Sequence, residues 1–313
     1  MQINVDMGRA LAARDWQALA ALAPAASVEA DRAPTVPDDD AGAVSHARDG
    51  VERKLGAMLD AFEGSRLPEL ADGRLTAGRG ADPSVFDSAR LAVRGLALAQ
   101  RNLLERWEAN HLGHPLEAGG GSLGGVQPDP ILQGLVDVIG QGKSDIDAYA
   151  RIVEGLTKYF ERVADVMSKL QDYISAKDDK NMKIDGHAIR QLLDDVIKQL
   201  PTMQLPKGAD IARWRKELGD AVTISDTGVV TINPDKLEKM RDSLPDSSDV
   251  VWDTARYQAW NTAFSGQKDN IQNDVQTLVE KYSHQNSNFD NLVKVLSGAI
   301  STLMDTAKSY LQI

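Results

Sequence analysis

The chain has 313 residues and a formal net charge of −11, from 35 basic and 46 acidic side chains. This length predicts about two domains and a core large enough to be stable without cross-links. The acidic balance argues against nucleic acid as a partner, because such a surface repels a polyanion and no basic run offsets the repulsion.

Cysteine is absent, which excludes disulfides, thiolate nucleophiles and thiolate metal sites. This favours a cytosolic protein, or one exported unfolded through a narrow channel that a cross-link would block. The apolar runs are far shorter than the roughly 20 residues of a membrane-spanning helix, so we expect no direct membrane span. The first 20 residues lack the basic start and apolar stretch of a Sec-type signal peptide.

Residues 1–43 are predicted to form a mobile, acidic N-terminal segment. Within them, Pro24–Ala43 contains two further prolines and the run Asp38-Asp39-Asp40. Prolines and clustered like charges disfavour a packed core, so we expect no fixed structure here.

Residues 44–125 predict an N-terminal helical hairpin that ends in a glycine-rich linker. One helix is expected over about 44–62, and a second from Asp82-Pro83-Ser84, a capping residue followed by a favourable helix start, to about 111. The connection between them is polar and contains glycine, which is typical of a loop.

The strongest periodic pattern lies in 126–176, the predicted first coiled-coil helix region. Its apolar residues alternate gaps of three and four: Tyr149, Ile152, Leu156, Tyr159, Val163, Val166, Leu170 and Tyr173. Such a pattern is typical of a coiled coil or a long bundle helix. A second apolar stripe runs beside the first, so we expect more than one partner helix to cover this seam.

Residues 263–313 predict a matching C-terminal coiled-coil helix. Its seam has the same alternation of gaps: Ile271, Val275, Leu278, Tyr282, Gln285, Phe289, Leu292, Leu296, Ala299, Leu303, Thr306 and Tyr310. Gln285 is a polar residue within this seam, and such a residue can fix the register of paired helices.

Residues 177–262 predict a small mixed α/β insertion between the two coil helices. Ala221–Ser225 and Val229–Ile232 alternate apolar and polar residues around a glycine-containing turn, which predicts a β-hairpin. The ends of a compact unit often lie close together. We therefore expect the two coil helices to pair antiparallel. The fold class is mainly α, with a long central antiparallel coiled coil and an α/β insertion.

The motifs of the chain favour a protein without catalytic, cofactor-binding or metal sites. Gly120–Gly124 matches a nucleophile-elbow pattern by letter, but no strand precedes it. Asp178–Gly186 resembles a calcium loop but lacks ligands at the required positions, so a polar turn that caps the next helix is the better interpretation. His111 and His114 could supply two metal ligands, but no third is evident, so exposed helix-end residues are favoured.

Several stretches resemble the needle-tip family of type III secretion systems, and the resemblance extends from about Gly125 to the C-terminus. The residues that carry it are Pro128–Asp147, Trp214–Gly219, Trp260–Asp269 and Tyr310–Ile313. The family fold implies a central antiparallel coiled coil, an N-terminal helical hairpin packed on it and a mixed α/β domain between the coil helices.

The resemblance also implies a function. Family members are secreted to the tip of the needle on the bacterial surface, after residence in the cytoplasm, and cap the needle as a small oligomer, often a pentamer. They regulate secretion and provide a platform for hydrophobic translocator proteins, while the hairpin acts as an internal chaperone. Some members bind bile salts between hairpin and coil, so a bile-salt-like ligand is an open expectation. The alternatives are a cytoplasmic coiled-coil adaptor or chaperone, and an enzyme, which the absence of a complete catalytic motif disfavours.

The C-terminal end of the coil is the predicted binding site for the needle subunit, because a long helix with an apolar flank can accept another helix. The start of the first coil helix is expected to face it. An equally weighted alternative is that these residues only pack between the two coil helices and bind no partner. The predicted contact residues are Leu296, Ile300, Leu303, Leu311 and Ile313 with Asp145 and Tyr149.

Overall fold

The computed structural model describes residues 38–71, 74–112 and 130–311. The predicted N-terminal segment therefore lies outside the described residues up to position 37, and the glycine-rich linker lies wholly outside them. The chain divides into two compact units. Unit 1 contains the residues up to Asp49, Gly95–Asp147 and those from Ser283 onward, and unit 2 contains Gly50–Arg94 and Ala148–Tyr282.

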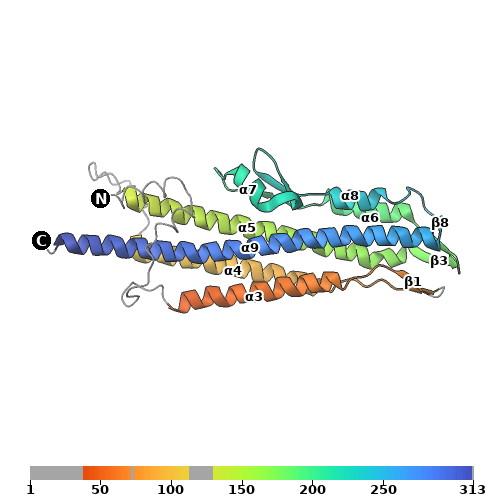
Figure 1. Ribbon diagram of the computed structural model, residues 1–313, viewed down its shortest axis with the longest axis horizontal. Coiled ribbons are helices and arrows are strands. Elements are labelled where there is room, and N and C mark those ends of the chain that lie inside the picture. The colour runs from red at the N-terminus through yellow and green to blue at the C-terminus, as the bar shows by residue number, and fades with distance from the viewer. Residues whose placement is uncertain (1–37, 72–73, 113–129, 312–313) are drawn as a thin grey trace. The chain divides into compact units, whose positions relative to one another are not determined.

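Four long helices account for most of the described residues (Figure 1). They are α3 (Asp38–Glu63), α4 (Pro83–Leu112), α5 (Pro130–Lys169) and α9 (Thr254–Leu311). Each contributes residues to both units. The predicted hairpin helices correspond to α3 and α4, and the predicted coil helices to α5 and α9.

The ends of these helices follow from local chemistry. Asp82 begins α4 as predicted: its carboxylate accepts the backbone N–H of Ser84 at 2.9 Å, and this bond lowers the pKa of Asp82. Asp253 accepts the N–H of Arg256 at 2.7 Å and begins α9 at Thr254, earlier than the sequence analysis placed it. No proline interrupts the chain after that cap, so nothing delays the helix.

The coil helices pair antiparallel, as predicted. In unit 2, the carboxylate of Asp274 on α9 is close enough to Tyr159 on α5 to raise its pKa further above the effect of burial, and Glu154 on α5 does the same to Tyr282 on α9. The later residue of α5 therefore pairs with the earlier residue of α9, as in an antiparallel pair. In unit 1 the same two helices touch where Gly142 lies against Leu292.

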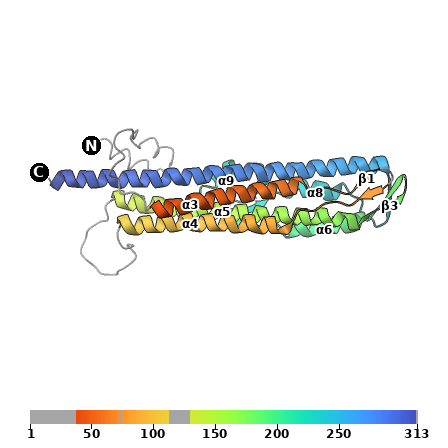
Figure 2. The ribbon, with the colours of Figure 1, turned by 90° about the horizontal axis from the view of Figure 1, so that it is seen from below.

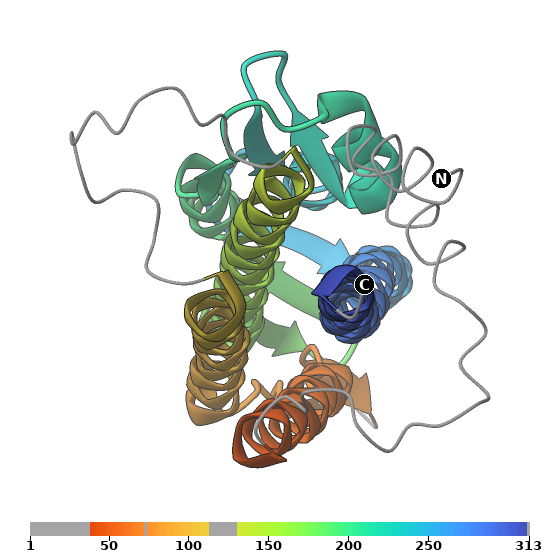
Figure 3. The same ribbon diagram turned by 90° about the vertical axis from the view of Figure 1, so that its left-hand side faces the viewer.

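Helices α3 and α4 cover the wide seam of the coil helices, as the second apolar stripe predicted. Their segments run beside those of α5 and α9 within each unit (Figures 2 and 3). In unit 2, Phe62 of α3 stacks on Phe160 of α5 with ring centroids 3.7 Å apart, and Phe86 of α4 meets the same ring edge-on at 6.4 Å. All three rings are buried, and this contact joins three helices in one core.

Ion pairs line the contact between α4 and α5. In unit 2, Arg94 Nε lies 2.8 Å from a carboxylate oxygen of Glu154, and Arg90 pairs with Glu161. In unit 1, Lys143 Nζ lies 2.8 Å from Glu108. The partner numbers again run in opposite directions, so α4 is antiparallel to α5.

The polar residue buried in the seam is Asn286, and Gln285 is only half-buried, so the prediction at this position was wrong by one residue. Asn286 accepts a hydrogen bond from the Gln100 amide of α4 at 3.2 Å, and both side chains are at most 3% exposed. The gaps in the sequence allow either residue to face inward. The choice depends on the amide that α4 presents, which the periodicity of α9 alone does not reveal.

The mixed α/β region contains two three-stranded antiparallel sheets among the described residues, in unit 2. The first has the order β3-β4-β8, with β3 (Ile174–Asp178), β4 (Asn181–Ile184) and β8 (Val250–Asp253). The second has the order β5-β7-β6, with β5 (Thr202–Gln204), β7 (Val229–Ile232) and β6 (Val222–Ile224). Helices α6 (Gly186–Lys198), α7 (Ile211–Leu218) and α8 (Asp235–Asp242) and the 3₁₀ turns Leu170–Asp172 and Gly219–Ala221 complete the region.

The first sheet explains how the chain returns to the coil. Strand β3 follows α5 and β8 precedes α9, and both pair with β4. The predicted hairpin is β6–β7, and its turn places Gly228 at a φ of 78°, which glycine adopts without strain. Asp185 caps α6 as predicted, by accepting the N–H of Ala188 at 2.9 Å.

The connection between α3 and α4 is more ordered than the sequence analysis predicted. It forms a two-stranded sheet, β1 (Glu69–Ala71) with β2 (Arg74–Thr76), extended by an isolated bridge between Arg66 and Arg79. Strands of three residues are too short for an alternating pattern to show.

Substitutions in the Gln100–Asn286 pair test its role. Gln100→Leu or Asn286→Leu leaves the partner amide buried and unpaired, so each should lower the free energy of unfolding in urea by about 1–3 kcal/mol. The double variant removes both polar groups and should recover most of the loss. Gln285→Leu, the matched control, should change stability by less than about 0.5 kcal/mol. Additive losses in the double variant would show that the two amides do not depend on each other.

Candidate functional site

The last turns of α9 extend beyond the described ends of its neighbours in unit 1 (Figure 2). Antiparallel α3 pairs Arg48 with Asp290 and begins ten residues before Arg48, so it reaches about residue 300 of α9. Helix α5 is also antiparallel to α9, and its Gly142 lies against Leu292. Because α5 begins twelve residues before Gly142, it reaches about residue 304 of α9.

Helix α4 ends at a similar level. Its Trp107 Nε1 lies 3.4 Å from Ser297 Oγ, and α4 ends five residues later at Leu112. Thr302, Asp305, Thr306 and Ser309 of α9 are exposed. Among the described residues, therefore, no helix accompanies α9 over its last two turns.

The predicted contact residues on α9 fall into two groups. Leu296 and Ile300 are 1% and 6% exposed and pack inside unit 1, so they are accessible only if a neighbouring helix moves. Leu303 is half-buried at the point where the neighbours end. Leu311 is the last residue of α9, and only its backbone is described. Ile313 lies outside the described residues.

Asp145 and Tyr149 are buried and do not face the end of α9. The Gln141 amide donates a hydrogen bond to Asp145 at 2.7 Å. The Tyr149 hydroxyl donates to Glu217, and its ring lies 4.5 Å from that of Trp214. Because α5 and α9 are antiparallel, the residues of α5 beside the end of α9 are those before Gly142. The antiparallel pairing predicted from the sequence could have indicated this.

Ser301 is a polar group near this end that the sequence analysis did not identify. Its hydroxyl oxygen is buried and has no hydrogen-bond partner among the described residues. A buried hydroxyl without a partner costs free energy, so a bound molecule that supplies a partner would gain from it.

A second candidate feature, in unit 2, fixes the connection of the hairpin to α9. Lys268 is 7% exposed, and its ammonium donates to the backbone carbonyls of Glu63 at 3.1 Å and Ser65 at 2.6 Å. It also lies 5.5 Å from the centre of the Phe62 ring. Burial lowers the pKa of Lys268. The ammonium satisfies carbonyls at the C-terminus of α3, where the helix dipole favours a cation.

Two more side chains of α9 hold the same connection. The Tyr257 hydroxyl and the Asn261 amide both donate to the Pro68 carbonyl, at 2.7 and 3.0 Å. Burial raises the pKa of Tyr257 to about 12. The turn of the hairpin is therefore attached to α9 by buried hydrogen bonds, and no sequence pattern predicted this attachment.

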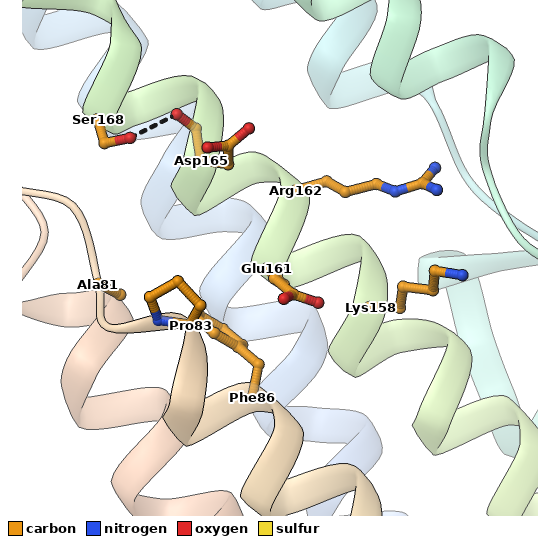
Figure 4. A pocket seen from close by; sticks show the side chains of 8 residues that line it. All are labelled: Ala81, Pro83, Phe86, Lys158, Glu161, Arg162, Asp165 and Ser168. Carbon is orange, nitrogen blue, oxygen red and sulfur yellow. Dashed lines mark hydrogen bonds between the residues drawn. The ribbon is translucent and has the colours of Figure 1, made fainter.

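A cleft of about 430 Å³ lies between α4 and α5 in unit 2 (Figure 4). Pro83 and Phe86 form its apolar side, while Lys158 and Arg162 extend from α5 away from them. The carboxylates of Glu161 and Asp165 also line it, so the cleft combines apolar, cationic and acidic groups.

The described part of the chain contains neither a group of metal-ligating side chains nor a membrane-spanning helix. His111 donates from Nδ1 to the Trp107 carbonyl at 2.8 Å and stacks on that indole, whereas His114 lies outside the described residues. In the described ranges, no group of three or more metal-ligating side chains is found, and no helix combines the length and apolarity needed to cross a bilayer.

A family model for tip complex components of type III secretion systems matches residues 129–311. The chain belongs to this tip-complex family. The match spans α5, the mixed α/β region and α9, the elements on which the predicted resemblance rested.

Similar proteins agree with membership of the tip-complex family. Translocator protein BipD of Burkholderia thailandensis is 75% identical over 313 residues, and BipD of Burkholderia pseudomallei is 74% identical, with full coverage of both chains in each comparison. A solved structure of B. pseudomallei BipD, described as a component of the type III secretion system, has a TM-score of 0.76 at 74% identity and covers 87% of this chain and 100% of its own. A pathogenicity island 1 effector protein from Chromobacterium violaceum shares only the fold, at 22% identity and a TM-score of 0.51, over 95% of this chain and 99% of its own.

Removal of the buried ammonium tests the attachment of the hairpin. Lys268→Met leaves two carbonyls without a donor and should lower the free energy of unfolding by about 1–3 kcal/mol. Backbone amides at 65–68 should exchange faster with deuterium. The matched control Lys294→Met, at an exposed position of α9, should leave both measurements unchanged. Equal exchange in the two variants would show that Lys268 does not hold the connection.

Proposed function

We propose that the chain caps the needle of a type III secretion system, regulates secretion and serves as the platform for translocator assembly during host-cell invasion. Membership of the tip-complex family and the BipD relatives, which are named translocator proteins, support this. The chain acts by binding other proteins and has no catalytic role or cofactor. A cytoplasmic coiled-coil adaptor without a role in secretion is the less favoured alternative.

The exposed end of α9 is the observation that carries the proposal of needle binding. The needle subunit packs its own helix along the turns from Leu303 to the C-terminus, including Leu311 and Ile313. Leu296 and Ile300 form the buried base of this surface. Asp145 and Tyr149 contribute indirectly, by fixing α5 and the neighbouring α7.

The hairpin acts as an internal chaperone that shields the coil before assembly. The α4 ion pairs are partly exposed, and pairs of this kind contribute little to stability. The buried bonds to Lys268 and to the Pro68 carbonyl hold the turn of the hairpin more firmly. Once the apolar packing of the hairpin on the coil is released, this contrast would keep the connection attached while the helices separate.

Before export the protein resides in the cytoplasm, and after export it assembles at the needle tip as a small oligomer, with a pentamer as the expected form. The absence of cysteine supports export as an unfolded chain. A bile-salt-like ligand would occupy the cleft beside Phe86, with its anionic group near Lys158 or Arg162.

Truncation before Leu311 tests the proposed needle surface. The shortened chain should lose binding to its cognate needle subunit, followed by NMR chemical shifts, while circular dichroism shows an unchanged helical content. Leu91→Ser is the matched control, because Leu91 is a 67% exposed apolar residue of α4 outside the surface, and it should bind normally. Unchanged binding by the truncated chain would refute the proposed site.

A further inference from the structure

A second cleft in unit 2 is positively charged, although the whole chain is acidic. The cleft has a volume of about 470 Å³ and is lined by Arg90 and Arg94 of α4, Arg151 and Lys158 of α5, and a single carboxylate, that of Glu154. The net charge of the chain is −11. With four cations and one carboxylate, the lining of this cleft is positively charged, whereas the chain as a whole is negatively charged.

Two of these cations are not neutralised by a neighbour. Arg90 pairs with Glu161, and Arg94 pairs with Glu154. Arg151 and Lys158 are exposed, and the described residues offer them no ion pair or hydrogen bond. They lie seven residues apart on α5 and so project from the same side of the helix, two turns apart. Their charge is available to a bound molecule.

The opposite wall of the cleft is an open sheet edge. Strand β5 lines the cleft and pairs only with β7 among the described strands. The N–H of Leu205 donates to the Gly228 carbonyl at 2.9 Å, and Met203 lies opposite Val230. Because hydrogen-bonded pairs alternate along an antiparallel ladder, Thr202 and Gln204 direct their backbone N–H and C=O groups away from β7.

The open edge lies next to the charged helix, at Gly155 of α5. A Cβ atom on Gly155 of α5 would lie 2.9 Å from the sulfur of Met203, so this flexible side chain would have to shift. Met203 of β5 therefore lies directly against α5 at Gly155, between Arg151 and Lys158. The open edge and the two free cations border the same space.

We propose that this cleft binds an acidic, extended segment of a partner protein, which adds to β5 as a further strand. Its backbone bonds to Thr202 and Gln204, and the carboxylates on one of its faces approach Arg151 and Lys158. The open edge selects an extended peptide, and the unneutralised cations select an acidic one. The site is separate from the proposed needle surface on α9, so either can fail without the other.

The test uses the full-length chain and a fluorescein-labelled peptide of alternating glutamate and valine, with the lysine–valine peptide as the charge-reversed probe. The acidic peptide should raise fluorescence anisotropy at low salt even though the whole chain is acidic, whereas any attraction of the basic peptide to the acidic surface should leave Thr202 and Gln204 unprotected. On binding, the backbone amides of Thr202 and Gln204 should become protected from deuterium exchange. Binding without that protection would overturn the proposal, because simple charge attraction does not protect a strand edge.

Substitutions separate the contribution of the two cations from that of the backbone hydrogen bonds to β5. Arg151→Glu with Lys158→Glu should weaken binding of the acidic peptide by about tenfold or more. Lys177→Glu with Lys216→Glu is the matched control, since it changes charge equally at exposed residues outside the cleft, and it should weaken binding far less. Gln204→Pro removes one outward N–H donor and should abolish the protection at Thr202. Equal weakening by the two double variants would also overturn the proposal.

Discussion

Burial of a wide apolar seam on α5 and α9 is the requirement on which the rest of the structure depends. Two antiparallel helices bury only the facing stripe of such a seam, and the adjoining stripe stays exposed unless further helices cover it. Helices α3 and α4 provide that cover, with Phe62 and Phe86 packed on Phe160. The hairpin is therefore part of the hydrophobic core and cannot leave without exposing apolar surface.

Besides this apolar packing, the hairpin is held by two kinds of polar contact with different energies. Along α4 the contacts with α5 include partly exposed ion pairs, which salt screens and which contribute little individually. At its turn, the Lys268 ammonium and the hydroxyl of Tyr257 satisfy backbone carbonyls inside the protein. Loss of a buried partner costs more than loss of an exposed one, so of these polar contacts those at the turn should resist opening the most.

Much of this fold could be predicted from the sequence because long amphipathic helices repeat their pattern many times. The antiparallel pairing of α5 and α9 also followed, since the insertion had to return the chain. Short elements gave no such pattern: β1 and β2 have three residues each, and the sequence analysis placed only a loop there. The error at Gln285 has another cause, because the inward residue was selected by the amide of Gln100 on a different helix.

The candidate site could be predicted only in part. The end of α9 followed from its position and its apolar flank. The burial of Leu296 and Ile300 depends on where α3, α4 and α5 end, and the orientation of Asp145 depends on register, neither of which the pattern of one helix contains. Likewise, the open edge of β5 became visible only when strand order was known.

The buried amine of Lys268 has one practical consequence. Amine-reactive reagents modify the neutral, accessible form of lysine, and this Nζ is covered by Phe62 and engaged by two carbonyls. Acylation at this one position would therefore occur only in molecules whose hairpin turn has come away from α9. The protein thus carries an intrinsic chemical reporter of that opening.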